Sequence, residues 1–349
     1  MQQIPTIKLI LENLQPILIL GFSGFVLAMA LTPVYTKFAF DYKWWKKPRK
    51  DTVSGEEAKI YQKMHAEKHK RNIPTMAGVI GLVALAVVTI VGNLDRGQTW
   101  LPLAAAIGAG MIGLLDDVVN LRGSGTGTAG LNFKIKLFLT TIIAAGLSYW
   151  FVYKLGYTGV HIPFGGDVTF LPALMFIGFV LIIIATANAV NITDGLDGLA
   201  GGLLVTAFGA FATIAILQGN FGIAGFCLTM VGVLLSYLWF NIFPARFFMG
   251  DVGSFAFGTT LAVVAIMLNA TLLIPVIGFI FVVEVSSAAA QLLSKRILRR
   301  KIFISAPIHH HFEAKGWPET KVTMRFWVLG QVSAVVGLLT AVLGGFLQL

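Results

Sequence analysis

The stretch that organises this chain is Asn188-Ala-Val-Asn-Ile-Thr-Asp-Gly-Leu-Asp-Gly-Leu-Ala-Gly201, which interrupts two long apolar runs. It holds two carboxylates, two carboxamides and three glycines. Asp194 and Asp197 are three residues apart, so on a helical turn they would share one face. A carboxylate at the centre of a membrane helix costs on the order of 2.5–3.5 kcal/mol, so such groups usually mark a functional polar site. The alternative is a plain turn whose aspartates cap the second helix.

The composition predicts a membrane protein. Hydrophobic residues make up 56% of the 349 residues and charged residues only 12%, whereas a soluble domain carries about 25% charged residues. The single cysteine, Cys227, excludes a disulfide within the chain. Residues 1–15 lack both a basic segment and a small-residue cleavage site, so no removable signal peptide is expected.

Apolar runs of roughly 20 residues predict an all-α polytopic membrane protein with ten transmembrane helices. The helices are expected near residues 16–36, 75–93, 99–118, 133–153, 169–190, 198–218, 221–241, 253–269, 271–294 and 326–348. Between the fourth and fifth helices, residues 157–167 are expected to form a small periplasmic β-hairpin that turns at Gly165-Gly166. The whole chain, residues 1–349, is interpreted as a single membrane domain.

Basic residues predict how the helices are oriented. In the arrangement with ten helices, all but three of the 26 Lys and Arg fall on one side, mostly in the loops 37–73 and 295–325. Positively charged loops stay in the cytoplasm. Both termini are therefore expected on the outer side of the membrane. The net charge of +10 is attributed to these loops, and no nucleic-acid partner is expected.

Five acidic residues gather at the inner ends of the predicted helices, namely Asp116, Asp117, Asp194, Asp197 and Asp251. Adjacent carboxylates repel each other, and the C-terminus of a helix disfavours them further. The Asp116-Asp117 pair therefore has little structural justification, whereas Mg²⁺ or a positively charged clamp would explain it. Asp251 is either the N-cap of the helix that follows it or a metal ligand.

Two further features lie near the end of the chain. His309, His310 and His311 form a triplet in the last inner loop. Zinc is the weaker interpretation because no companion cysteines are present, and contacts with phosphate or sugar fit better. Glu284, inside the ninth predicted helix, is expected to pair within the bundle rather than to act in catalysis.

Together these motifs resemble the phospho-N-acetylmuramoyl-pentapeptide-transferase family, within the polyprenyl-phosphate N-acetylhexosamine-1-phosphate transferases. The resemblance runs from about residue 63 to the C-terminus. It rests on Lys70-Arg-Asn-Ile-Pro-Thr-Met-Ala-Gly78, Asp116-Asp117, the Asn188–Gly201 stretch, Asn241, Phe248-Met-Gly-Asp-Val-Gly-Ser254 and Pro307-Ile-His-His-His-Phe-Glu313. One departure is Asn120, which stands where the family commonly has a lysine, so Lys136 is expected to carry more of the phosphate contact.

The resemblance implies transfer of phospho-MurNAc-pentapeptide from UDP-MurNAc-pentapeptide to undecaprenyl phosphate, giving lipid I and UMP, in peptidoglycan synthesis. It implies Mg²⁺ as cofactor and a homodimer in the lipid bilayer. Asp251 would bind the metal, Asp116 would be the general base, Asp117 would position the site, and Asp194 would orient the phosphates. The residues implied in substrate binding are Lys70, Thr75, Lys136, Asn188, Asn191, Asp197, Asn241, Phe248, His309, His310 and His311.

Two other functions stay open at this point. One is a relative that transfers GlcNAc-1-phosphate from UDP-GlcNAc to the same lipid. The other is an ion-coupled transporter, because acids within a membrane also line ion paths. A transporter is expected to have its acids near the middle of the bilayer, whereas the acids of this sequence cluster at one face.

Overall fold

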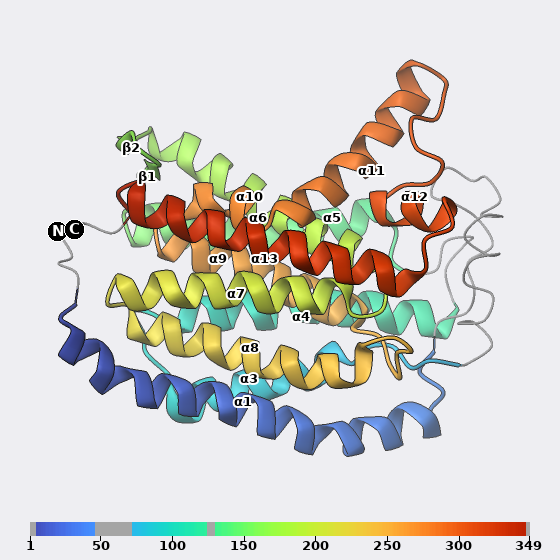
Figure 1. Ribbon diagram of the computed structural model, residues 1–349, viewed down its shortest axis with the longest axis horizontal. Coiled ribbons are helices and arrows are strands. Elements are labelled where there is room, and N and C mark those ends of the chain that lie inside the picture. Colours follow the sequence, from blue (N-terminus) through green and yellow to red (C-terminus); the bar gives the residue numbers. More distant parts are fainter. Residues whose placement is uncertain (1–4, 46–71, 124–129, 347–349) are drawn as a thin grey trace.

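A computed structural model describes residues 5–45, 72–123 and 130–346. Within these residues, eight helices are long and apolar enough to cross a membrane, and they form one bundle (Figure 1). They are α1 (Ile7–Asp41), α4 (Trp100–Arg122), α5 (Phe133–Tyr149) with its π-helical continuation η1 (Trp150–Lys154), α6 (Pro172–Thr193), α7 (Leu199–Leu217), α8 (Phe221–Asn241), α9 (Gly250–Met267) and α13 (Glu319–Leu343). The prediction of a mostly helical, multi-pass membrane protein is therefore confirmed.

Two of the ten predicted segments differ from a plain spanning helix. The second is α3 (Gly78–Gly92), whose 15 residues give a length of about 22 Å, less than a hydrocarbon core of about 30 Å. The ninth is broken into η2 (Thr271–Leu273), α10 (Ile274–Ile277) and α11 (Phe279–Ile297), with a bend of 82°. Pro275 and Gly278 explain the break, because proline and glycine are the usual causes of sharp kinks in helices.

Helix α9 lies at the centre of the bundle, between α4 and α6. Glycines let these helices approach closely, because a Cβ at Gly113 of α4 would collide with the backbone carbonyl oxygen of Asp251. On the other side, a Cβ at Gly258 of α9 would come within 2.9 Å of Ala187 Cα. Small residues commonly serve this purpose in membrane bundles. Their effect here is to press the first turn of α9 directly against α4.

The segment before α3 pairs with the segment before α9. Phe248 N–H donates to the carbonyl oxygen of Pro74 (2.8 Å), and Ala77 N–H donates to that of Phe248 (3.0 Å). Gly250 has a φ of +76°, and a Cβ there would lie 2.5 Å from Asp117 Oδ2. A side chain at Gly250 would therefore be strained and would also displace an acidic residue.

Two ends of the bundle are distinct. At one end lie the C-termini of α4 and α6, the N-termini of α5 and α9, and the short helix α12 (Ile308–Ala314) (Figure 1). At the other end, β1 (Gly159–Ile162) pairs antiparallel with β2 (Gly166–Thr169). The turn was expected at Gly165-Gly166, but Gly166 is the first residue of β2, so the turn lies before it. His161 of the hairpin contacts Asp167 Oδ1 at 2.9 Å and the Gly344 carbonyl oxygen at 2.8 Å, so the hairpin is joined to the end of α13.

Candidate functional site

Lys136 brings together two aspartates from different helices. Its Nζ lies 3.5 Å from Oδ2 of Asp116 on α4 and forms an ion pair with Oδ2 of Asp251 on α9. The ammonium group also lies 4.4 Å from the centre of the Phe255 ring. The three charged side chains are largely buried. Within the described residues, the two carboxylates share this ammonium group, so the three side chains form one charged cluster.

The turn before α5 explains how Lys136 reaches Asp116. Leu131 N–H donates to Asp116 Oδ1 at 2.7 Å, which fixes the carboxylate against the turn. Asn132 is the N-cap of α5, and its side chain accepts a hydrogen bond from Lys134 N–H at 3.1 Å. Since α5 begins at Phe133, Lys136 lies in its first turn.

Asn191, near the end of α6, holds the other side of Asp251. Its amide group donates to Asp251 Oδ1 at 3.3 Å and to Ser254 Oγ at 2.8 Å. Helix α9 begins at Gly250 and its N-cap is Met249, so the interpretation of Asp251 as an N-cap is wrong. The Asp251 carboxylate instead lies between Lys136 and Asn191.

Asp117 differs from its neighbour because it faces the backbone of α9. Its side chain is completely buried, and Oδ2 accepts a hydrogen bond from Val252 N–H at 3.0 Å. The first amide groups of a helix have no partner within the helix, and the N-terminal dipole favours a negative charge. Asp117 therefore fixes the first turn of α9, which carries Asp251.

The prediction that Asp194 and Asp197 share a helical face is wrong. Helix α6 ends at Thr193 and α7 begins at Leu199, so residues 194–198 form a turn. Gly198 has a φ of +77°, a left-handed conformation that glycine adopts without strain and that is incompatible with a continuous α-helix from α6 to α7. Asp194 is half-buried in this turn, whereas Asp197 is buried.

Asp197 and Asn241 hold this turn against the loop that precedes α9. Asp197 Oδ2 accepts from Ala245 N–H at 3.0 Å. Asn241 accepts from Gly198 N–H at 2.9 Å and donates to the Phe247 carbonyl oxygen at 2.9 Å. These bonds are made to the protein's own backbone, and the substrate-binding roles of both residues stay predictions.

The remaining residues of the predicted site fall into three groups. Asn188 donates to the Ile184 carbonyl oxygen one helical turn earlier, at 2.8 Å. Thr75 is buried with no hydrogen-bond partner for its hydroxyl among the described residues, and Phe248 is half-buried in the adjoining segment. Lys70 lies outside the described residues.

The three histidines of α12 have different surroundings. His309 Nδ1 lies 2.8 Å from Oε2 of Glu284, which confirms that Glu284 pairs within the bundle. His310 Nδ1 lies 2.7 Å from Oε2 of Glu313. His311 Nδ1 accepts from Ile304 N–H at 3.2 Å. Desolvation and the charge of Lys315 lower the pKa of His311.

Metal binding has one suitable location in this cluster. Across the described ranges, no group of three or more His, Cys, Asp or Glu is placed to hold a metal ion. Mg²⁺, however, is usually held by only one or two carboxylates together with substrate phosphates and water. Asp116 and Asp251 supply carboxylate oxygens of the kind that magnesium prefers, so the chemistry of these residues fits a magnesium ion.

Three residues near Asp116 and Asp251 had no contact assigned to them in the predicted site, although Asn120 was noted as a departure from the family and Ser254 belongs to a quoted motif. Ser254 and Phe255 follow Asp251 by three and four residues, a spacing that places them on the same side of α9. Asn120 lies one turn after Asp116 and is buried, yet neither polar atom of its amide has a hydrogen-bond partner in the described part of the chain. Periodicity alone could have indicated all three positions.

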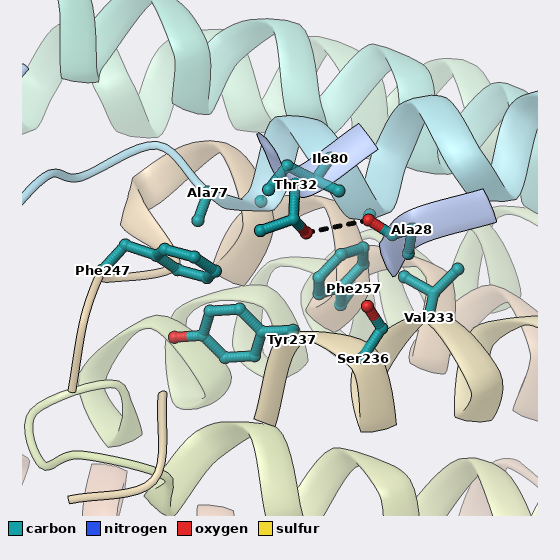
Figure 2. A pocket seen from close by; sticks show the side chains of 11 residues that line it. Ala28, Thr32, Ala77, Ile80, Val233, Ser236, Tyr237, Phe247 and Phe257 are labelled. Carbon is teal, nitrogen blue, oxygen red and sulfur yellow. Dashed lines mark hydrogen bonds between the residues drawn. The ribbon is translucent and has the colours of Figure 1, made fainter. Parts of the chain in front are cut away.

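A small cavity, lined by none of these acids, lies among α1, α3, α8 and α9 (Figure 2). Thr32, Ala77, Tyr237, Phe247 and Phe257 are among the residues that line it. It offers about the space that one water molecule needs. It is therefore too small for a nucleotide or a lipid, and the acid cluster is the better candidate for the reaction centre.

Comparisons with known proteins show the family of the chain. Residues 99–269 match the glycosyl transferase family 4, and this range contains Asp116, Lys136, Asn191 and Asp251. A phospho-N-acetylmuramoyl-pentapeptide-transferase of Chloroflexus aurantiacus is 37% identical over 351 residues, covering 96% of this chain and 92% of the relative. One of Bacillus mycoides is 36% identical over 332 residues, covering 93% and 97%. The chain belongs to the phospho-N-acetylmuramoyl-pentapeptide-transferase family.

Proposed function

We propose that this protein transfers phospho-MurNAc-pentapeptide from UDP-MurNAc-pentapeptide to undecaprenyl phosphate, giving lipid I and UMP, in peptidoglycan synthesis. The observation that carries the proposal is the meeting of Asp116, Lys136 and Asp251, from three helices, at one end of a membrane bundle. Family membership supplies the substrates. The position of the acids at helix ends supports an enzyme over a transporter, whose ion path would need acids near the middle of the bilayer.

The location of the site suits these two substrates. The lipid phosphate lies at the membrane interface, and the nucleotide arrives from the aqueous side. Most of the lysines and arginines that the structure describes lie at this end of the bundle, so the proposal places the site on the cytoplasmic side by the positive-inside rule. The chain crosses the bacterial inner membrane ten times, with α3 and the broken α10–α11 segment counted as crossings. Both termini and the β-hairpin then lie in the periplasm.

In the reaction, Asp116 takes the proton from the phosphate of the lipid, acting as general base. An oxygen of that phosphate attacks the phosphorus atom that carries the sugar. The bond from this phosphorus to the oxygen of UMP breaks, and UMP leaves. One phosphoanhydride replaces another, so the step is reversible and needs no other energy source. Direct attack is preferred over a covalent intermediate on an aspartate.

The other residues of the cluster place the reacting groups. Lys136 contacts both carboxylates and is suited to hold a phosphate oxygen beside them. Asn191 fixes the orientation of Asp251, and Asp117 fixes the turn of α9 that carries it. When bound to Asp251, Mg²⁺ would neutralise the pyrophosphate charge and activate UMP as leaving group.

Substrate recognition is assigned to the surrounding loops. Phe248 would stack on uracil together with a polar contact from Asp197, and Thr75 and Lys70 would cover the nucleotide. Asp194 and Asn188 would face the phosphates. His309, His310 and His311 would contact phosphate or sugar oxygens. The working unit is proposed to be a homodimer.

The direct test is UMP release by the purified protein with UDP-MurNAc-pentapeptide, undecaprenyl phosphate and Mg²⁺. We expect release that depends on the lipid and stops when EDTA is added. Release from UDP-GlcNAc instead would indicate the relative that transfers GlcNAc-1-phosphate. Uptake of substrate into vesicles without UMP release would indicate a transporter and would refute the proposal.

A further inference from the structure

Glu284 of α11 and His309 of α12 form a buried pair near the turn between α6 and α7, residues 194–198. Glu284 Oε2 lies 2.8 Å from His309 Nδ1, and the two side chains are 0% and 1% exposed. Glutamate is almost never fully buried unless it is paired. A carboxylate accepts hydrogen bonds, so Nδ1 must carry the hydrogen of this bond. The pair therefore fixes both the tautomer and the orientation of the imidazole ring.

A second bond holds the start of α12 on α11 without involving the ring. Ile308 N–H donates to Ser287 Oγ at 2.9 Å, and Ser287 in turn donates to the Glu284 carbonyl oxygen at 2.7 Å. The backbone of α12 is thus attached beside the Glu284–His309 pair. The effect of Glu284 on the ring can consequently be separated from the docking of the helix.

The opposite edge of the ring faces the turn between α6 and α7. A Cβ at Gly195 would collide with His309 Nε2, so the ring edge lies directly against this glycine. Gly195 follows Asp194 and is exposed. Nε2 has no hydrogen-bond partner within the part of the chain that the structure describes. A buried polar atom without a partner is costly, and a bound polar group beside Gly195 would remove that cost.

We propose that Glu284 is a positioning residue, which holds His309 so that Nε2 bonds a phosphate or sugar oxygen of the nucleotide-linked substrate beside Gly195. This inference rests on the proposed function. Glu284 acts through His309 and does not touch the substrate. Gly195 is required because any larger residue would push the ring edge away from the substrate.

The first test is a double-mutant cycle on kcat/KM for UMP release with Glu284→Leu and His309→Ala. Loss of a carboxylate that orients a metal-ligating histidine typically costs about 10–100-fold, and we expect a loss of similar size for Glu284→Leu. The double variant should be no worse than His309→Ala alone, because Glu284 works only through the ring. Glu284→Gln, which keeps an acceptor for Nδ1–H, should recover most of the activity. Ser287→Ala is the control for helix docking and should keep most of it as well.

The second test adds a methyl group beside the ring. Gly195→Ala should lower kcat/KM by about 10–100-fold, as displacement of the ring has the same effect as loss of its support. Gly178→Ala is the matched control, because a Cβ there meets nothing within 4 Å. Thermal melting of every variant in detergent identifies those that do not fold. Glu284→Gln and Gly195→Ala keep the test decisive if Glu284→Leu fails to fold.

The outcomes separate this inference from the proposed function. A wild-type protein that releases UMP, with losses for Glu284→Leu and His309→Ala that multiply in the double variant, would overturn the positioning role alone. Full activity of Gly195→Ala would also overturn it. A wild-type protein without UMP release would overturn the proposed function and this inference with it.

Discussion

Replacing Lys136 with methionine removes the ammonium group that contacts both Asp116 and Asp251. The variant keeps a side chain of similar length but leaves the two carboxylates, which are 6% and 17% exposed, without their shared ammonium. Losing one preorganised charged donor of this kind costs about 10²–10³ in kcat, equivalent to about 2.7–4 kcal/mol. We expect Lys136→Met to fall in this range. Lys136→Arg should do better, although the planar guanidinium cannot reproduce both contacts.

The assay is UMP release under saturating UDP-MurNAc-pentapeptide, with thermal melting to check the fold. Lys134→Met is the matched control, since Lys134 lies in the same helical turn but is exposed. A surface substitution changes free energies by only about 0.5 kcal/mol, so this control should stay within about twofold of the wild type. If folded Lys136→Met kept more than about a tenth of the wild-type kcat, the assigned role of this lysine would be refuted.

Three further variants test how the site is built. Gly113→Val should separate α4 from α9 and destabilise the protein by about 1–3 kcal/mol. The melting temperature and UMP release should both fall, and an unchanged melting temperature would contradict the close packing. Asn191→Leu removes the two hydrogen bonds that orient Asp251 and Ser254. Each bond contributes about 0.5–1.5 kcal/mol, so kcat should fall with little change in KM. A change confined to KM would contradict this role. Asp197→Ala leaves the buried Ala245 amide without its partner, which costs about 1–3 kcal/mol of stability, so the melting temperature should fall. A normal melting temperature with a raised KM for the nucleotide substrate would indicate uracil binding instead.

Much of the bundle was predictable because hydrophobic runs report the lengths of membrane helices directly. The segments that differ, α3 and α11, do so for local reasons. The pairing of Pro74 and Ala77 with Phe248 precedes α3 and shortens it, and a break at Gly278 bends the ninth segment. Hydropathy averages over a window and does not register either effect.

The site was predictable in its members more than in its contacts. Asp116, Lys136, Asn191 and Asp251 could be identified as polar residues at the same end of apolar helices, and the structure brings them together. The three-residue spacing of Asp194 and Asp197 wrongly predicted that they share a helical face. Helix α6 ends at Thr193, and both residues lie in the turn that leads to Gly198, whose φ is positive. The individual hydrogen bonds and ion pairs depend on the distance between helices. Glycines such as Gly113 set that distance through contacts between residues far apart in the sequence, so it could not be predicted from the sequence.

The central claim is that Asp116, Lys136 and Asp251 form the reaction centre, and one single-turnover experiment tests it most directly. UMP release is measured from enzyme in excess over UDP-MurNAc-pentapeptide, with undecaprenyl phosphate and Mg²⁺, for the wild type and for Asp251→Asn. The wild type should release UMP until this reversible step reaches equilibrium, while folded Asp251→Asn should approach it more slowly by about 10²–10³-fold, as for loss of a preorganised charged group. A rate for Asp251→Asn within about tenfold of the wild type would contradict the account.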